Sequence, residues 1–166
     1  TNHDENSWHG TEFERLGDGV RTYATFIFTA YGIPMMYSGQ DAGLNKRLKF
    51  FEKDSIDWSD PQKFFPFYQQ LVKIHADNKA LWGGAEGAMA VRINDDDPAV
   101  LAYRRTRDAN DVIVVLNLSA KPQTLRLKEA GAAGSYTDQF TGKAFTLSTD
   151  KPLALEPWQY LVFVKQ

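Results

Sequence analysis

The 166-residue chain carries 19 basic and 21 acidic residues, so its net charge is −2 and no basic surface for nucleic acid is expected. Hydrophobic residues make up 43% and charged residues 24%, which excludes disorder as the default state. The chain has no cysteine, which excludes disulfides and thiolate metal sites within it, and no apolar run approaches the roughly 18 residues of a membrane span.

The first predicted element is a helix. Apolar residues between Phe13 and Tyr31 recur at steps of three and four, which is the spacing of one helix face. Gly32 should end this helix, because a residue without Cβ is favoured just past a helix end, and Pro34 prevents the helix from continuing. Residues 33–37 are then predicted to form a short strand that is buried on both faces.

A long loop and a second helix follow. Residues 38–59 show no strong periodicity, and a connection of that length is usually functional or flexible. Asp60 and Pro61 should open the next helix, with Asp as the N-cap and Pro at the first helical position. Its apolar face includes Phe64 and Leu71, and it should end before Gly83.

From Gly84 onward the pattern changes to short apolar runs separated by turn-forming residues. Eight strands are predicted, at 88–93, 100–103, 112–118, 124–127, 134–138, 144–147, 153–155 and 160–164. Their spacing of about ten residues favours an antiparallel β-sandwich. The sequence therefore predicts two domains, at residues 1–83 and 84–166, with the texture changing between about 80 and 87.

A polar cluster, Asn2-His3-Asp4-Glu5, stands at the start of the chain, where we expect a strand to end. Two carboxylates, an imidazole and an amide in four positions could hydrogen-bond several sugar hydroxyls and hold a negative charge beside a developing cation. The same residue types are also common as turn and cap residues. The spacing alone leaves both interpretations open.

The combination of motifs is more specific. Asn2-His3-Asp4, a helix, the pattern Gly32-x-Pro34-x-x-Tyr37-x-Gly39-x-Asp41, the segment 50–58, a second helix and a terminal β-sandwich together resemble the C-terminal part of the alpha-amylase family, glycoside hydrolase family 13. The resemblance implies an α+β fragment. It would consist of the last strand and helices of a (β/α)8 barrel, followed by the antiparallel β-sandwich called domain C.

The resemblance also implies residue roles. Asp4 matches the aspartate that stabilises the transition state through hydrogen bonds to the sugar hydroxyls. His3 matches a histidine that contacts the same sugar, and Asn2 matches the amide that positions the motif. The family pattern commonly has Gly-x-Glu where this chain has Gly39-Gln40-Asp41, so the shorter Asp41 is not assigned a role.

Retaining glycosidases need a nucleophile and an acid/base carboxyl about 5 to 5.5 Å apart. In the family these groups come from barrel strands that would precede Thr1, so the chain is expected to lack both and to be inactive alone. The expected parent is an α-glucan hydrolase acting on starch or maltodextrin α-1,4 linkages. A cyclomaltodextrin-acting or glucosyl-transferring member of the family, or a non-catalytic carbohydrate-binding or scaffold module, is the alternative.

No cofactor or metal is predicted for the chain itself, although calcium in the full-length parent stays open. The Asp95-Asp96-Asp97 run lacks the ligand alternation of a calcium loop, so a solvated turn is expected there. The compartment is undetermined, and a secreted or periplasmic parent is compatible with the sequence. Residues 13–78 are expected to pack their apolar faces onto the sandwich or to bury them in a partner chain, including a second copy.

Three tryptophans could stack on sugar rings, namely Trp58, Trp82 and Trp158. Packing between the helical half and the strand-rich half is the favoured interpretation for all three.

Overall fold

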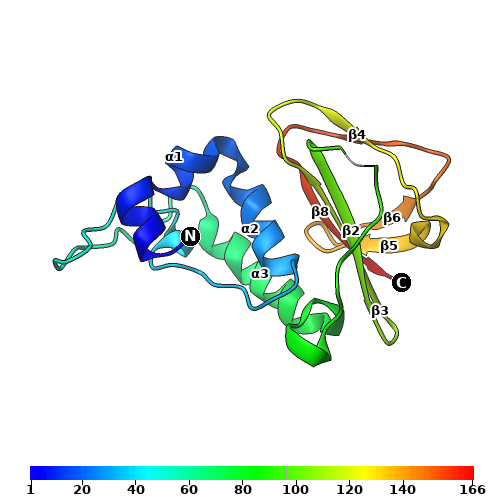
Figure 1. Cartoon of the computed structure of the whole chain (residues 1–166), viewed down its shortest axis with the longest axis horizontal. Coiled ribbons are helices and arrows are strands. Elements are labelled where there is room, and N and C mark those ends of the chain that lie inside the picture. The colour runs from blue at the N-terminus through cyan, green and yellow to red at the C-terminus, as the bar shows by residue number, and fades with distance from the viewer. Residues whose placement is uncertain (96) are drawn as a thin grey trace.

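A computed structural model describes residues 1–95 and 97–166. Helices occupy the first half of the chain and an antiparallel sheet occupies the second, with helices on one face of the sheet (Figure 1). The α-helices are α1 (Glu12–Leu16), α2 (Val20–Thr29) and α3 (Phe64–Asp77). Shorter helical turns are η1 (Glu5–His9), η2 (Gly17–Gly19), η3 (Gln40–Ala42), η4 (Lys79–Leu81), η5 (Gly84–Glu86) and η6 (Ala130–Ala132).

The first predicted helix exists but is interrupted. Thr11 caps α1 in a capping box, in which its side chain accepts from the Glu14 N–H while the Glu14 carboxylate accepts from the Thr11 N–H. Gly17 then adopts a φ of 53°, which favours glycine, and the chain passes through η2 before α2 begins. The helix ends at Thr29 rather than at Tyr31, because Ala30 is already extended.

The predicted strand at residues 33–37 is wrong. These residues form no strand in the structure, and they are exposed rather than buried on both faces: Ile33 is 91% and Met35 54% accessible. A parallel barrel strand is held by neighbours on both edges. No neighbouring strand lies on either side of this segment within the described residues, so its backbone has no ladder to join. The structure therefore lacks the predicted last strand and does not confirm the barrel portion, although the predicted helices on either side of this segment are present.

Asp60 caps the second long helix from a different position than expected. Its two carboxylate oxygens accept from the backbone N–H groups of Phe64 and Phe65, at 2.6 and 2.9 Å. The helix therefore begins at Phe64, and Pro61 lies outside it. It ends at Asp77, after which η4 leads toward the sheet. Asp60 does accept the first N–H groups of the helix, but the N-cap position is Lys63 and the helix starts three residues later than predicted.

All eight predicted strands are present as β1 (Val91–Arg92), β2 (Val100–Arg107), β3 (Asn110–Asn117), β4 (Gln123–Leu125), β5 (Gly134–Asp138), β6 (Ala144–Leu147), β7 (Leu153–Leu155) and β8 (Tyr160–Lys165). They form a six-stranded sheet in the order β1-β2-β3-β8-β5-β6 and a separate pair, β4-β7. Every pairing is antiparallel. The predicted β-sandwich is thus confirmed, and its two sheets are unequal in size, with six strands in one and two in the other.

The six-stranded sheet is buried on both faces. One face packs under the β4–β7 pair, in a core that includes Val115, Leu125 and Phe163. The other face packs against the end of α3 and η4, where Ile74 and Leu81 meet Val114. The helical and strand-rich parts therefore share a core, and the division at residue 83/84 stays a prediction.

The three tryptophans differ in whether they pack between the helical and strand-rich halves or stay exposed. Trp158 lies between the halves, with its ring 6.4 Å from that of Tyr23 and its carbonyl accepting from the Thr22 hydroxyl. Trp82 donates its indole N–H to the Ala76 carbonyl but remains 39% exposed. Trp58 is 62% exposed, so the expectation that it packs between the halves is wrong.

Apolar side chains remain on the far side of the helical half. Phe65 and Val72 on α3 are about half exposed, and together with Met36 they line a groove of about 390 Å³. The expectation that residues 13–78 pack onto the sandwich therefore holds for one side of the helices. Burial of the other side in a partner chain stays a prediction.

Arg105 on β2 ties the two halves together. Its guanidinium is fully buried and donates to five backbone carbonyls, of Thr29, Ala30, Leu81, Trp82 and Ala88, at 2.7 to 3.1 Å. Two of these carbonyls lie at the C-terminal end of α2, where a helix leaves its acceptors unsatisfied. Burial lowers the pKa of Arg105. The carbonyls supply the hydrogen bonds that a buried cation otherwise takes from water.

Replacing Arg105 by methionine should lower the free energy of unfolding by about 3 kcal/mol, because five carbonyls would be left buried without donors. Chemical denaturation followed by circular dichroism measures this loss. Arg126→Met is the matched control, since Arg126 is exposed and should change stability by less than about 0.5 kcal/mol. Equal losses in the two variants would contradict a central role for Arg105.

Candidate functional site

The polar cluster at the start of the chain forms a helical turn. Residues 3–4 are helical and lead into η1, and Asn2 caps this turn by accepting the Glu5 N–H at 2.9 Å. The amide oxygen of Asn2 is therefore used within the protein. The cap interpretation that the sequence left open is correct for Asn2, and it fixes the position of the two residues that follow.

His3 and Asp4 lie side by side on the surface. The His3 Nε2 is 3.5 Å from the Asp4 Oδ2, and their side chains are 63% and 57% exposed. Glu5 points to different partners: its carboxylate lies 2.6 Å from Arg15 and 3.5 Å from His9. Of the two adjacent carboxylates, Asp4 is the more accessible, and its ion-pair partner among the described residues is the His3 imidazole.

Asn6 attaches the turn to the long loop, and sequence analysis did not single it out. Its side chain is buried, donates to the Lys46 carbonyl at 3.1 Å and accepts the Leu48 N–H at 2.7 Å. The Ser7 hydroxyl donates to the Leu48 carbonyl at 2.6 Å. An asparagine with both a donor and an acceptor can pair with extended backbone in this way. Only the fold brings residues 40 positions apart together.

Aromatic rings surround His3. The Phe50 ring lies 5.3 Å from the His3 ring and 5.2 Å from the Trp8 ring, and the Phe51 ring lies 4.7 Å from that of Phe50. Trp8 is 54% and Phe51 is 85% exposed. We call Trp8, Phe50 and Phe51 the aromatic patch. It places flat apolar faces next to a carboxylate and an imidazole. The start of the chain lies in the helical half, away from the sheet (Figure 1).

Behind this surface lies a buried carboxyl group. Glu12 is only 7% exposed, and its Oε1 has no hydrogen-bond partner among the described residues. It lines a small cavity with Thr1, Tyr37 and Gln40. Burial raises the pKa of Glu12 to about 7.

Asp41 lies elsewhere. It lines the groove with Met36 and Phe65, whereas the Gln40 side chain accepts the Tyr37 N–H and donates to the Tyr68 hydroxyl. Gly39 before them has a φ of 81°, and a Cβ there would approach Leu44 to 2.9 Å. The Gly-Gln-Asp segment thus shapes a tight turn, and Asp41 does not join His3 and Asp4.

Across residues 1–95 and 97–166, no group of three or more His, Cys, Asp or Glu side chains could hold a metal ion. In the predicted solvated turn, Asp95 pairs with Lys128 at 2.7 Å and the Asp97 carboxylate accepts the Ala99 N–H. Asp96 lies outside the described residues. Within the same ranges, no helix is long and apolar enough to cross a membrane.

The chain is similar to known proteins over most of its length. Residues 92–162 match the family model described as Maltogenic Amylase, C-terminal domain. Alpha-amylase 2 of Dictyoglomus thermophilum is 27% identical over 161 residues, which cover 89% of this chain and 26% of that protein. The family model, the amylase relatives and the solved structures support a C-terminal fragment of an alpha-amylase-family enzyme. The strand-rich half of the chain is the antiparallel C-terminal domain of amylase-family enzymes.

A further relative and one solved structure extend the comparison. A cyclomaltodextrinase of Thermoanaerobacter pseudethanolicus is 29% identical over 134 residues, covering 73% of the chain and 22% of that protein. The crystal structure of a noncanonic maltogenic alpha-amylase, AmyB from Thermotoga neapolitana, superposes with a TM-score of 0.82 at 16% identity, over 99% of this chain and 40% of that one. The chain thus spans about a quarter of the length of these curated relatives.

Glu12 makes stability depend on pH. Its pKa is about 7 in the folded chain against a reference of 4.5, so the folded state binds the proton more tightly and stability falls as pH rises from about 4.5 to about 7. The loss should be on the order of 3 kcal/mol and should level off at higher pH. Denaturation at pH 5 and pH 8 measures it. Glu12→Gln should abolish this pH-dependent loss of stability. The control Glu86→Gln, in the exposed turn η5, should retain it. An unchanged pH profile in Glu12→Gln would show that Glu12 is not the group responsible.

Proposed function

We propose that this chain is part of a retaining α-glucan hydrolase of the alpha-amylase type, acting on the α-1,4 linkages of starch and maltodextrins. Asp4 is its transition-state-stabilising carboxylate, and His3 binds the same sugar. The observation that carries the proposal is the surface at the start of the chain, where an exposed carboxylate and imidazole stand beside an aromatic patch. The family-model match and relatives named alpha-amylase support it.

The proposed roles follow from the chemistry of sugar cleavage. An oxocarbenium-like transition state develops positive charge on the ring, and a nearby carboxylate stabilises it. Asp4 is exposed enough to meet a sugar, and no Lys or Arg within the described residues neutralises it by an ion pair. Asn2 acts indirectly under this proposal, because its amide oxygen caps the turn that presents His3 and Asp4. The patch rings offer apolar faces against which a sugar can stack.

The same proposal makes the isolated chain inactive. Retaining hydrolysis needs two carboxyl groups about 5 to 5.5 Å apart, one as nucleophile and one as proton donor. Glu5 is held by Arg15, and Glu12 is buried in a small cavity, so neither is available beside Asp4 for that pair. Asp4 would stabilise a cation that other parts of the enzyme generate.

The purified chain should release no reducing sugar from starch or maltotriose above the buffer background, because it lacks the nucleophile and the proton donor. A reducing-end assay over long incubations measures this. Activity that disappears in Asp4→Ala but survives in Asp57→Ala would contradict the proposal, since Asp57 is an exposed carboxylate in the loop after the patch.

In an enzyme that contains this chain, Asp4→Asn should lower kcat by about 10²- to 10³-fold with a smaller change in KM, because the lost interaction strengthens in the transition state. Steady-state kinetics on maltooligosaccharides measures the split between kcat and KM. Asp57→Asn should leave both nearly unchanged. A purely structural Asp4 would instead lower thermal stability and the amount of active enzyme without lowering kcat per active site.

The cyclomaltodextrinase relative supports a second substrate class, cyclic maltodextrins, for the same site. Comparing rates on cyclic and linear maltodextrins with the same number of glucose units distinguishes the two classes. A glucosyl-transferring member would form transfer products in place of hydrolysis products. The non-catalytic alternative, a carbohydrate-binding or scaffold sandwich, requires measurable glucan affinity that maps to residues 88–166. Calorimetric titration of the chain with maltooligosaccharides tests it.

A further inference from the structure

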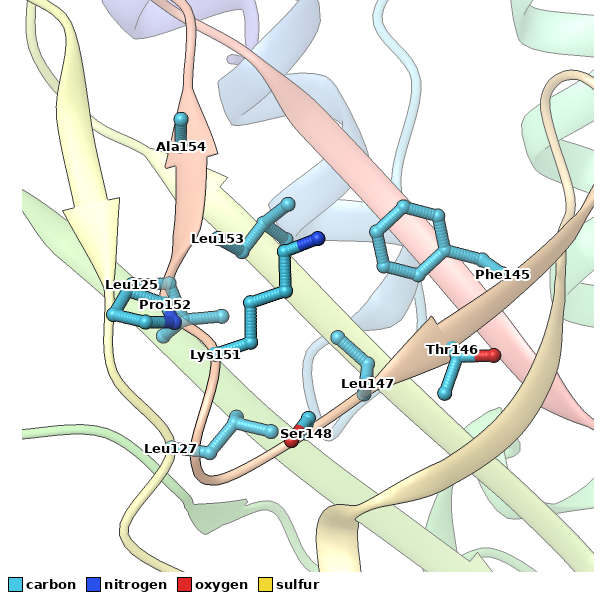
Figure 2. A pocket seen from close by; sticks show the side chains of 10 residues that line it. All are labelled: Leu125, Leu127, Phe145, Thr146, Leu147, Ser148, Lys151, Pro152, Leu153 and Ala154. Atoms are coloured by element: carbon cyan, nitrogen blue, oxygen red, sulfur yellow. The ribbon is translucent and has the colours of Figure 1, made fainter.

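A second cavity opens on the face of the sheet opposite the helices. It has a volume of about 450 Å³ and lies between β6 on one side and the β4–β7 pair on the other. Figure 2 shows Leu125, Leu147, Leu153 and Phe145 around it, with Lys151 between them. Nothing in the proposed glucan site reaches this cavity, because His3 and Asp4 belong to the helical half of the chain.

The unequal sandwich produces this cavity. The β4–β7 pair has only three residue pairs in register, so it cannot cover the whole face of a six-stranded sheet. Beneath β6, the edge strand, the core therefore opens to the surface. Leu125 and Leu147 in the lining are nearly fully buried and belong to the same core cluster as Phe163, so the cavity continues the hydrophobic core outward. Its volume is that of a small-molecule site.

The cavity has an apolar lining and one cation. Lys151 lies in the turn that joins β6 to β7, and its amine lies between the Leu153 and Phe145 side chains (Figure 2). In the part of the chain that the structure describes, no carboxylate forms an ion pair with it. The Thr146 hydroxyl points away from the cavity centre in the same view. A mainly apolar volume with one ammonium group in its lining complements a hydrocarbon chain that ends in an anion.

We propose that this cavity binds a medium-chain fatty acid, with its hydrocarbon chain against Leu125, Leu147 and Phe145 and its carboxylate at Lys151. A sugar is a poorer match, because it needs several hydrogen-bonding groups and the lining is mainly aliphatic. The cavity faces away from the helices, so a ligand there does not compete with the packing of α2 and α3 on the sheet. This site is independent of the proposed glucan site.

Calorimetric titration of the full chain with octanoate, decanoate and dodecanoate below their micellar concentrations tests the proposal. Affinity should rise about fourfold for each added methylene, since each buried methylene contributes about 0.8 kcal/mol. Lys151→Gln should weaken decanoate binding about threefold to fivefold and leave the binding of 1-octanol unchanged. Lys121→Gln, at an exposed lysine outside the lining, is the matched control and should change neither.

Nuclear magnetic resonance locates the bound molecule. Backbone shifts on decanoate addition should concentrate on residues 145–154 and on β4. Several outcomes would overturn the proposal: affinity that does not depend on chain length, equal effects of Lys151→Gln and Lys121→Gln, shifts centred on the groove at Phe65 and Val72, or maltotriose in place of decanoate shifting the lining residues. Circular dichroism of Lys151→Gln checks that the exposed substitution leaves the fold intact.

Discussion

The buried guanidinium of Arg105 is the interaction on which the rest of the structure depends. It donates to carbonyls at the end of α2, in η4 and in the segment before β1. Among the described residues no strand pairing joins these three segments, although one backbone hydrogen bond links Ala88 to Ala80. A planar group with five N–H donors can satisfy such a cluster, whereas a lysine ammonium has only three. Because a buried cation without hydrogen bonds is costly, these three segments are held in one arrangement. The helices consequently pack on the sheet where Ile74 and Leu81 meet Val114.

A second set of polar contacts builds the surface at the start of the chain. Asn2 caps the first turn, Asn6 pairs with the backbone of residues 46–48, and Thr11 closes the capping box of α1 while its hydroxyl contacts Asn45. These side chains make hydrogen bonds within the protein, whereas His3 and Asp4 remain exposed beside the aromatic patch. Asp4 rather than Glu5 is the candidate catalytic carboxylate, because Glu5 pairs with Arg15 whereas Asp4 stays exposed.

The two candidate sites differ in the physics that forms them. The glucan surface is polar and exposed and belongs to the helical half, whose far side still carries a groove lined by Phe65 and Val72. The cavity at Lys151 is apolar and arises because a three-residue strand pair cannot cover a six-stranded sheet. One site therefore depends on polar side chains that the fold leaves exposed, and the other depends on the geometry of the unequal sandwich.

Local patterns in the sequence predicted the strands and the side chain that accepts the first N–H groups of α3. Alternating apolar residues and turn clusters predicted all eight strands, three of them with correct bounds, and Asp60 was recognised as a cap, because these features depend on neighbours along the chain. The segment 33–37 reads as a buried strand by the same rules, yet it stays exposed and unpaired, since a strand needs partners that local sequence does not supply. Arg105 and Asn6 gave no sequence pattern either, because their partners lie 17 or more residues away. The sequence by itself determined the helices, the eight strands and the family motif, but not the conformation of residues 33–37. The tertiary structure decided which polar side chains hydrogen-bond within the protein and which remain exposed to a ligand, because long-range contacts determine this.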